Sequence, residues 1–488
     1  MNDIDILIYM SDQHTASISG FMGDQIVRTP NLDRLANEGT VFDHAYTSCP
    51  LCVPSRTSFL TGQLPSRMCV FNNSTSFPAD QPTFVHSVAT KGYETVLCGR
   101  MHFIGPDQRH GFSKRYVGDI CHPYWGNGPL DNSDYGEFGR SFAAKYCLDI
   151  IGKGDSPVLA YDRDVVESVL GYLKQDHHGP QLIVTGTYAP HFPYMAPAEL
   201  VDYYYDKMTT PTVGLDSLNY DLDFIKHKFE TASEDMLKVL KATYYAMIEI
   251  MDAQIGKVRA AWEEYLKRNN RKGVFIYLSD HGDQLGERQL YGKQTFFEYS
   301  SRIPCIIQGE NIPQGKRVDG LVSIMDIGPT ICALVGAKIP PQQAGVSLVD
   351  TIINGASLNN RVVLSEYMEK DCDGNKTPSF MVRKNDWKLI SYKSNSDIDL
   401  LFNLKNDADE INNLADTYPE VVMELKKHIN SNWDIEQFKN NEKIKESHLE
   451  LMQEWGSIRN LDDDNFWKVP KNLRSAPKDS IIKDRSTY

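Results

Sequence analysis

Short, uninterrupted apolar runs constrain the fold of this chain more than any other feature of its sequence. The runs span residues 4–10, 181–186, 273–278 and 304–308. A run that is apolar at consecutive positions suits a strand buried on both faces, as in a parallel sheet covered by helices. Residues 162–174 read as a helix, and residues 233–267 carry apolar side chains at steps of three and four. The sequence therefore predicts an α/β fold whose large, mixed but mostly parallel sheet is flanked by helices.

Acidic and imidazole side chains follow two of these runs. Asp12 and Gln13 come just after the first run, and Asp280 and His281 come just after the third. Open α/β sheets bind ligands beyond the carboxyl ends of their strands, where an acid and an imidazole can hold a divalent cation. Asp12, Asp280 and His281 are therefore candidate metal ligands. The alternative for Asp12 is a loop residue that caps a helix, which is the role we predict for Asp283.

A cysteine next to a predicted helix is the candidate nucleophile. Residues 49–64 read Cys-Pro-Leu-Cys-Val-Pro-Ser-Arg-Thr-Ser-Phe-Leu-Thr-Gly-Gln-Leu. We expect Ser55 to cap a helix over residues 56–64, which places Cys52 just before the helix N-terminus. Free N–H groups and partial positive charge at that end favour attack on an anion. The alternatives are a buried structural cysteine and a redox pair with Cys49 in a C-x-x-C motif.

The pattern Cys-x-Pro-Ser-Arg from Cys52 to Arg56, followed by Leu-Thr-Gly at 60–62, resembles the signature of the type I sulfatases of the alkaline-phosphatase superfamily. In that family a maturation enzyme converts the cysteine to formylglycine, whose hydrated aldehyde attacks the sulfur of a sulfate ester. The resemblance implies this conversion at Cys52, which would also face the metal, and it implies that Arg56 steadies the hydrate. It further implies one divalent metal ion, with Ca²⁺ favoured and Mg²⁺ or Mn²⁺ as alternatives.

Further motifs of the family assign the remaining site residues. The Gly-Arg-Met-His at 99–102 resembles a Gly-Lys-x-His motif, so His102 would help to expel sulfate and Arg100 would bind substrate. His191, between two prolines, matches the histidine that bonds the leaving-group oxygen, and Lys293 matches a lysine that holds a sulfate oxygen. Gln13 stands where many members have a second Asp, and we assign it to the substrate, with contact to the metal as the alternative. The alternatives are histidines in the core or in a surface loop, and an exposed lysine.

The resemblance limits the range of candidate substrates but does not identify one of them. Residues 104–112 resemble choline sulfatases in particular, whereas the Asp12-Gln13 pair resembles both choline sulfatases and phosphonate monoester hydrolases. Choline would need an aromatic cage, for which Tyr124, Trp125 and Tyr194 are candidates. Residues 113–160 are predicted to be irregular and to form the wall that selects the leaving group.

Choline sulfate and a sulfated sugar are therefore both candidate substrates. Phe192 is apolar where a carboxylate would help to bind a cation, and residues 436–488 do not match the tail of choline sulfatases. The alternative enzyme is a phosphonate or phosphate monoester hydrolase with the same site. The alternatives from other classes are an inactive sulfatase-like binding protein and a thiol redox protein.

We expect a catalytic domain over residues 1–360 and a C-terminal subdomain over residues 361–488. Strand character at 379–392 and a resemblance of 399–415 to the C-terminal module of the family predict a small α+β unit built on an antiparallel sheet. The tail has helical character around residues 442–454.

Composition limits the partners. The net charge of −14 argues against nucleic acid or an anionic membrane, because both are bound through basic patches. We expect no membrane span and no secretory signal, since no basic start is followed by an apolar run. Nine scattered cysteines fit a reducing compartment, so the expected location is the cytoplasm. The sequence leaves a homo-oligomer open.

Overall fold

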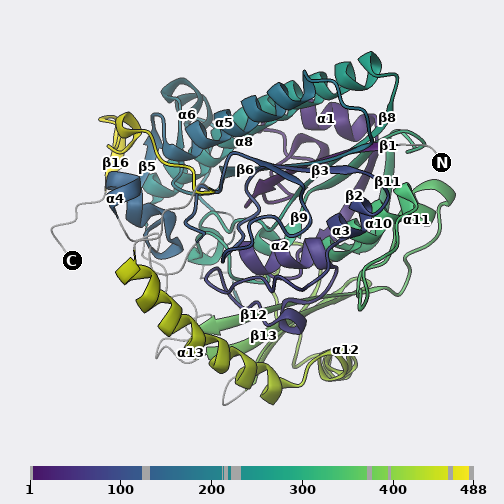
Figure 1. Cartoon of the computed structure of the whole chain (residues 1–488). Coiled ribbons are helices and arrows are strands. Elements are labelled where there is room, and N and C mark those ends of the chain that lie inside the picture. The colour runs from purple at the N-terminus through teal and green to yellow at the C-terminus, as the bar shows by residue number, and fades with distance from the viewer. Residues whose placement is uncertain are drawn as a thin grey trace.

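The computed structural model places a large central sheet between two layers of helices, with a smaller sheet beside them (Figure 1). The described residues are 4–123, 132–211, 213, 218–220, 232–370, 376–393, 397–459 and 465–482. None of the described helices is long and apolar enough to cross a membrane.

The central sheet is built around β1 (Ile4–Asp12), the first apolar run. Within the described residues it has nine strands in the order β11-β2-β10-β8-β1-β6-β3-β4, with β9 paired to β2. The other strands are β2 (Thr40–Tyr46), β3 (Glu94–Gly99), β4 (Lys114–Tyr116), β6 (Gln181–Pro190), β8 (Lys272–Ser279), β9 (Arg302–Ile303), β10 (Cys305–Gly309) and β11 (Lys316–Ser323). β1 is parallel to both of its neighbours, β6 and β8, whereas β10 is antiparallel to β8 and β2. The predicted mixed, mostly parallel sheet is confirmed.

Side chains of β1 enter two separate cores, because successive residues of a strand point to opposite faces. Leu7 and Tyr9 pack in one core, and Ile6 and Ile8 pack in the other. The first core lies under α1 (Pro30–Asn37), α5 (Pro157–Leu173) and α8 (Glu234–Arg268). The second lies under α2 (Cys52–Thr61), α3 (Phe84–Ala89) and α10 (Ile327–Val335). The helices therefore cover both faces of the sheet, as the apolar runs require.

The helix that carries the nucleophile begins earlier than the sequence predicts. α2 starts at Cys52, with Leu51 as its N-cap and no side-chain cap. The prediction that Ser55 caps this helix is wrong, because its hydroxyl donates to the carbonyl of Asp280 over 2.7 Å. Pro54 is tolerated because the first turn of a helix lacks internal hydrogen bonds to its N–H groups. Cys52 is therefore the first residue of the helix.

The segment predicted to be irregular, residues 113–160, contains several short elements in its described part. These are β4, α4 (Asn132–Tyr135), the 3₁₀ helices η3 (Gly136–Phe142) and η4 (Ala144–Tyr146), and β5 (Ile150–Lys153). Two of the cage candidates, Tyr124 and Trp125, lie outside the described residues.

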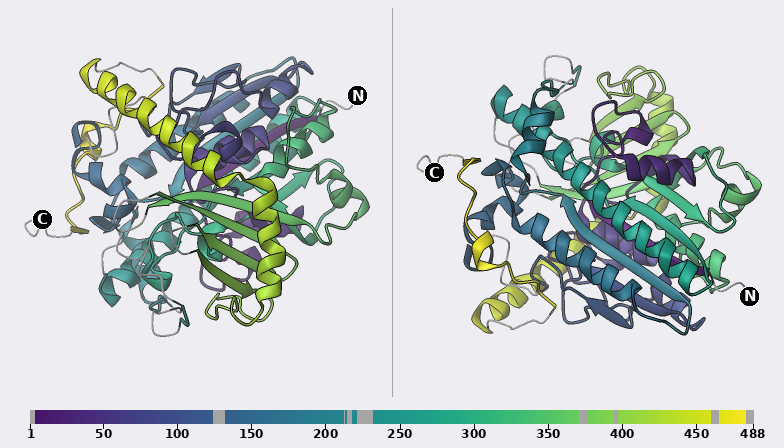
Figure 2. Two further views of the ribbon diagram at one scale, coloured as in Figure 1. Left: turned by 90° about the horizontal axis from the view of Figure 1, so that it is seen from below. Right: turned by 90° about the horizontal axis from the view of Figure 1, so that it is seen from above.

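The predicted C-terminal antiparallel sheet is confirmed. Its strands follow each other in the order β12 (Val362–Lys370), β13 (Lys376–Lys384), β14 (Trp387–Tyr392) and β15 (Ile398–Asn403). Two helices complete this part of the chain, α12 (Pro419–Asn432) and α13 (Ile435–Arg459). In the left view of Figure 2, α13 runs past the strands of this sheet. The domain boundary near residue 360 stays a prediction.

The last described segment, residues 465–482, returns to the first part of the chain. Asn465 accepts a hydrogen bond from the backbone N–H of Asp119, and Trp467 donates one to the carbonyl of Asp119, at 2.7 and 2.8 Å. Further on, β16 (Ser480–Ile482) pairs with β5 in a three-stranded sheet that also contains β7 (Met195–Ala196). The C-terminal segment therefore packs on the same part of the molecule as the loops that follow β3 and β6.

Candidate active site

The four predicted metal ligands meet at the carboxyl edge of the central sheet. Asp12 ends β1, and Asp280 and His281 follow β8, which is the parallel neighbour of β1. Cys52 reaches the same place from the N-terminus of α2. All four side chains are buried, and their ligand atoms lie within 4.8 Å of one another.

This donor set fits one divalent cation. Two carboxylates and an imidazole converge on residue 52, whose sulfur lies 3.7 Å from Asp12 Oδ1 and 3.3 Å from His281 Nε2. Carboxylate oxygens suit Ca²⁺, Mg²⁺ and Mn²⁺. The imidazole nitrogen is a less favourable ligand for Ca²⁺, which prefers an all-oxygen shell, than for a transition metal such as Mn²⁺.

Two buried arginines neutralise the outer carboxylate oxygens of the group. Arg56 donates from Nε to Asp280 Oδ2 over 2.8 Å and from Nη2 to Asp12 Oδ2 over 3.1 Å. Arg100 donates from Nε to Asp12 Oδ2 over 2.6 Å. The Oδ1 atoms stay on the inner side, since Asp12 Oδ1 faces Cys52 and Asp280 Oδ1 lies 3.7 Å from His281 Nε2. The arginines thereby orient the carboxylates, while the predicted contact of Arg56 with the nucleophile stays a prediction.

Positive charge also surrounds the sulfur of Cys52. Lys293 Nζ lies 3.1 Å from this sulfur and donates to Gln13 Oε1 over 2.8 Å. Burial alone would raise the pKa of the Cys52 thiol, but Lys293 and His281 outweigh it and hold the pKa well below its ordinary value of 9.0. The position therefore stabilises a negatively charged or strongly polarised group on residue 52.

His191 and Lys293 form a hydrogen-bonded pair beside the nucleophile. His191 Nδ1 donates to the carbonyl oxygen of Phe192 over 2.6 Å, so Nε2 is the acceptor that faces Lys293 Nζ at 2.5 Å. Burial, reinforced by the charge of Lys293, lowers the pKa of His191 to about 4. At neutral pH the imidazole is therefore uncharged, and its Nε2 accepts the hydrogen bond from Lys293 Nζ.

His102 approaches residue 52 from the loop after β3, with a backbone φ of 57°. Its backbone N–H donates to Asp119 Oδ2 over 2.7 Å, and its Nδ1 lies 2.7 Å from Nη2 of Arg100. Because a guanidinium can only donate, Nδ1 is the acceptor in this contact. The imidazole also interacts with the sulfurs of Cys52 and Cys121. Asp119 also accepts from Arg100 Nη1 over 2.8 Å, so one carboxylate positions both residues.

Asp283 does not cap a helix, contrary to the prediction. Its Oδ2 accepts from Gln13 Nε2 and from the hydroxyl of Tyr194, both over 2.6 Å, and its Oδ1 accepts from the backbone of Leu285 over 3.0 Å. The next helix, the 3₁₀ turn η6 (Glu287–Gln289), has Gly286 as its N-cap. Tyr194 is fully buried, and its hydroxyl supports Gln13 through Asp283. Its place in an aromatic cage stays a prediction.

Sequence reasoning missed three acids that support the site: Asp283, Asp119 and Asp162. Asp162, on α5, accepts from the backbone N–H groups of Tyr188 and Ala189 over 2.6 and 2.8 Å, just before His191. The contacts that link these acids to the site join residues 17 to 270 positions apart in sequence. No motif marked them, so only their place in the fold reveals them.

Two family models match this chain. The model described as Sulfatase matches residues 5–337, and that of the N-sulphoglucosamine sulphohydrolase C-terminal region matches residues 286–434. A choline-sulfatase of Rhizobium meliloti (strain 1021) is 32% identical over 435 residues, which cover 84% of this chain and 82% of the relative.

Two solved structures share the fold at 20% identity. One is a phosphonate monoester hydrolase of Agrobacterium radiobacter, with a TM-score of 0.71 over 88% of this chain and 95% of the other. The second was solved in complex with its substrate D-glucosamine-2-N,6-O-disulfate, with a TM-score of 0.72 over 90% of this chain and 98% of the other.

Proposed function

Because this chain belongs to the sulfatase family and is a sulfuric ester hydrolase, we propose that it cleaves a sulfate monoester through a formylglycine at position 52 and one divalent metal ion. One observation carries the proposal. Cys52 is the first, fully buried residue of α2, and its sulfur lies inside the group formed by Asp12, Asp280 and His281. A nucleophile held among metal ligands at a helix N-terminus is suited to attack on an anionic ester.

A hydrated aldehyde at this position would supply one hydroxyl for attack on sulfur and a second through which sulfate is later expelled. An unmodified thiol has no second hydroxyl, so it could not release sulfate in this way. Lys293, 3.1 Å from the Cys52 sulfur, stabilises negative charge on residue 52. His102, held by Arg100 and Asp119, is placed to move the proton of residue 52 that accompanies expulsion.

The metal ion, held by Asp12, Asp280, His281 and residue 52, would polarise the sulfate oxygens and lower the pKa of the attacking hydroxyl. The chain itself supplies the orientation of these ligands. Arg56 and Arg100 take the outer carboxylate oxygens, so the inner oxygens of both aspartates stay turned toward the ion.

We assign proton delivery to the leaving oxygen to the pair of Lys293 and His191. Lys293 holds the proton at Nζ, 2.5 Å from His191 Nε2, and the carbonyl of Phe192 fixes the ring. Gln13 accepts from the same Nζ, which limits the directions in which Lys293 can donate. A departing alkoxide beside this pair would receive its proton from Lys293 directly or by way of His191.

The substrate that we propose is a sulfated sugar. A quaternary ammonium at the ring of Phe192 would meet the like charge of Lys293, whose Nζ lies 5.1 Å from the ring centroid. Choline sulfate is the second candidate, because the relative at 32% identity is a choline-sulfatase. A phosphonate or phosphate monoester is a weaker alternative, since a likeness at 20% identity extends to the fold alone.

The test is release of inorganic sulfate by protein co-expressed with a formylglycine-forming maturation enzyme. The panel contains sulfated hexosamines and uronates, choline sulfate, an aryl sulfate and a phosphonate monoester, with Cys52→Ala as the control. We expect release from a sulfated sugar and a peptide mass that shows formylglycine at position 52. Full turnover by protein whose Cys52 is an unmodified thiol would overturn the mechanism. Release from choline sulfate alone would make choline sulfate the substrate in place of a sulfated sugar.

A further inference from the structure

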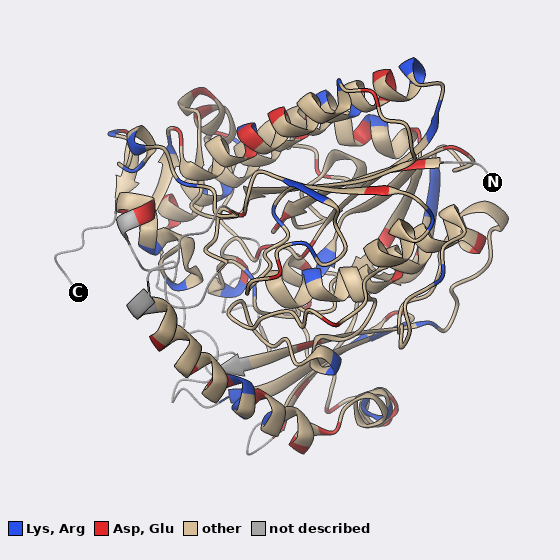
Figure 3. Ribbon diagram, viewed as in Figure 1, with Lys and Arg blue, Asp and Glu red and all other residues tan. Residues whose placement is uncertain are grey.

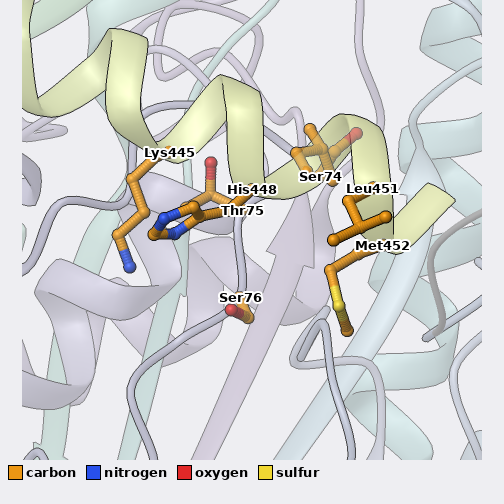
Figure 4. Close-up of a pocket in the computed structure, with 8 residues that line it drawn as sticks. Ser74, Thr75, Ser76, Lys445, His448, Leu451 and Met452 are labelled. Atoms are coloured by element: carbon orange, nitrogen blue, oxygen red, sulfur yellow. The ribbon is translucent and has the colours of Figure 1, made fainter.

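A cleft of about 370 Å³ separates α13 from the loop at residues 74–76. It is lined by Ser74, Thr75, Ser76, Lys445, His448, Leu449, Leu451 and Met452. Figure 4 shows Lys445, His448 and Met452 extending from α13 toward the side on which Ser76 lies. These three residues are spaced by three and four positions and therefore share one face of the helix. One wall of the cleft is thus a continuous helical face.

The opposite wall is connected to the nucleophile. Asn73, just before Ser74, accepts a hydrogen bond at Oδ1 from the backbone N–H of Val53 over 3.0 Å. Val53 is the residue after Cys52, in the first turn of α2. The loop that borders the cleft is therefore anchored next to the nucleophile.

The lining combines positive charge, hydroxyls and an apolar strip. Lys445 has no ion pair among the residues that the structure describes, and the described lining contains no acid. Two acids nearby on α13 are engaged elsewhere, since Glu442 and Glu446 bind Lys376 at 2.5 and 2.6 Å. Acidic and basic residues are interspersed along this helix as a whole (Figure 3). The cleft is positively charged because the face of α13 that lines it carries Lys445 and no acid.

We propose that this cleft is a leaving-group subsite that takes the acidic part of a sulfated oligosaccharide. Lys445 pairs with a carboxylate or a second sulfate of the chain, and His448 and the serine hydroxyls bond to sugar hydroxyls. Leu449 and Met452 pack against the apolar face of a sugar ring. A quaternary ammonium would meet the like charge of Lys445 and, among the described lining residues, no aromatic ring. The inference rests on the proposed sulfatase function and names the class of its substrate.

Binding to a variant that cannot turn over tests the cleft separately from catalysis. The background is Cys52→Ala, and the probe is a hexosamine–uronate tetrasaccharide with one terminal sulfate, titrated by calorimetry. In this background, Lys445→Glu should raise Kd for the tetrasaccharide about tenfold, as expected for reversing a partly exposed charge. The matched control is Lys443→Glu, an exposed lysine on the same helix that does not line the cleft, and it should change Kd less than twofold. Binding of the sulfated monosaccharide should not respond to either variant.

Three results would overturn the proposal. The tetrasaccharide does not bind, its Kd is unchanged by Lys445→Glu, or Lys443→Glu raises its Kd as much as Lys445→Glu does. In the otherwise unchanged enzyme, Lys445→Glu should raise KM for the tetrasaccharide and leave kcat unchanged. If binding depends on Lys445 but no sugar sulfate is hydrolysed, the proposed function fails and the subsite stands. If sulfate is released from the tetrasaccharide without any dependence on Lys445, the function stands and the subsite fails.

Discussion

The side-chain amide of Gln13 is held in one orientation by the carboxylate of Asp283. Gln13 Nε2 donates to Asp283 Oδ2 over 2.6 Å, so its Oε1 is left to accept from Lys293 Nζ over 2.8 Å. The backbone of Gln13 is in the left-handed region, with a φ of 71°, which points the side chain into the site. Asp283, two residues after the candidate ligand His281, thereby fixes the position of Lys293 beside the nucleophile through Gln13.

This relationship predicts the outcome of a charge exchange. Gln13→Glu would place two carboxylates 2.6 Å apart in a buried site, and we expect kcat/KM to fall about 100-fold. Adding Asp283→Asn restores one carboxylate and one amide with their positions exchanged. The double variant should therefore have a kcat/KM at least about tenfold higher than that of Gln13→Glu. The measurement is kcat/KM for the preferred sulfate ester in both single variants and the double variant. If the two losses simply multiply, Asp283 does not act through Gln13.

The redox alternative makes an opposite prediction for the two cysteines of the C-x-x-C motif. Both Cys49 and Cys52 are free, buried thiols, and burial raises the pKa of Cys49 well above its ordinary value. A sulfatase needs only position 52, so Cys49→Ser should keep activity within about twofold, whereas Cys52→Ser should lose it. The assay is sulfate release, with thermal unfolding as the check on folding. Equal loss of activity in well-folded Cys49→Ser protein would favour a thiol pair.

Removal of the metal should cost stability as well as activity. Asp12 and Asp280 are buried carboxylates, and without an ion their inner oxygens repel each other. Metal at 100 times its Kd stabilises the folded state by about 2.7 kcal/mol, so chelation should lower Tm by several degrees. Ca²⁺ is the ion expected from the sulfatase resemblance, whereas the nitrogen ligand of His281 favours Mn²⁺.

A thermal-shift titration of chelated protein with Ca²⁺, Mg²⁺ and Mn²⁺ separates these two expectations. The ion that restores Tm and activity at the lowest concentration is the resident metal. If none of the three ions changes the Tm of protein with the four ligands intact, the metal site is contradicted. Asp280→Asn is the matched variant, and it should respond at a much higher metal concentration.

The contact between the C-terminal sheet and the first part of the chain should depend on pH through Glu366, on β12. Its carboxylate accepts from the backbone and hydroxyl of Ser66 and from the indole of Trp433. Burial outweighs these donors and raises the pKa of Glu366 to about 7, from an ordinary value of 4.5. Folding therefore favours the protonated form. Its contribution to the free energy of unfolding is fully present below pH 4.5 and is lost as the pH rises through 7, by about 3 kcal/mol.

Glu366→Gln keeps the shape of the side chain and removes its titration. We expect the fall in stability between pH 6 and pH 8 to be smaller in this variant, as measured by denaturant unfolding at both pH values. Glu450→Gln, at an exposed position of α13, is the control and should leave the difference unchanged. An unchanged difference in Glu366→Gln would contradict the assignment.

Truncation tests the support that the C-terminal segment gives to the site. Asn465 and Trp467 hold the backbone of Asp119, whose carboxylate binds Arg100 and His102. A chain that stops after residue 464 should lose about tenfold in kcat because His102 is less firmly positioned, while its far-UV circular dichroism stays close to that of the full chain. A chain that stops after residue 482 is the control. Equal activity of the two truncated proteins would show that Asp119 needs no such support.

Much of the fold was predictable from residue patterns. The apolar run of β1 predicted a strand buried on both faces, and the structure confirms it because its neighbours β6 and β8 are also apolar runs. The antiparallel C-terminal sheet was predicted as well. The order of the strands was not, since it depends on how long segments pack, and no local pattern records that. The return of residues 465–482 was also missed, because β16 is only three residues long.

For the site, sequence reasoning reached the residues that lie within motifs. Asp12, Cys52, Asp280 and His281 were grouped in advance, and the structure brings them together. Their roles, and those of Arg56, His102, His191 and Lys293, stay predictions. The supporting acids could not be found in this way. The sequence predicts a helix cap for Asp283, because nothing in it indicates that Gln13, some 270 positions away, lies within hydrogen-bond distance.

The burial of Cys52 sets an order of events during synthesis of the protein. A residue with no exposed surface cannot enter the active site of another enzyme, so any conversion of Cys52 has to precede closure of the fold. The segment that holds Asp119 is synthesised long after Cys52, because residues 465–467 lie more than 400 positions further along the chain. At about 5–20 residues per second, synthesis of Cys52 and synthesis of residues 465–467 are separated by roughly 20–80 seconds. If Cys52 is converted to formylglycine as proposed, the late synthesis of the C-terminal segment leaves time for this conversion before the site is completed.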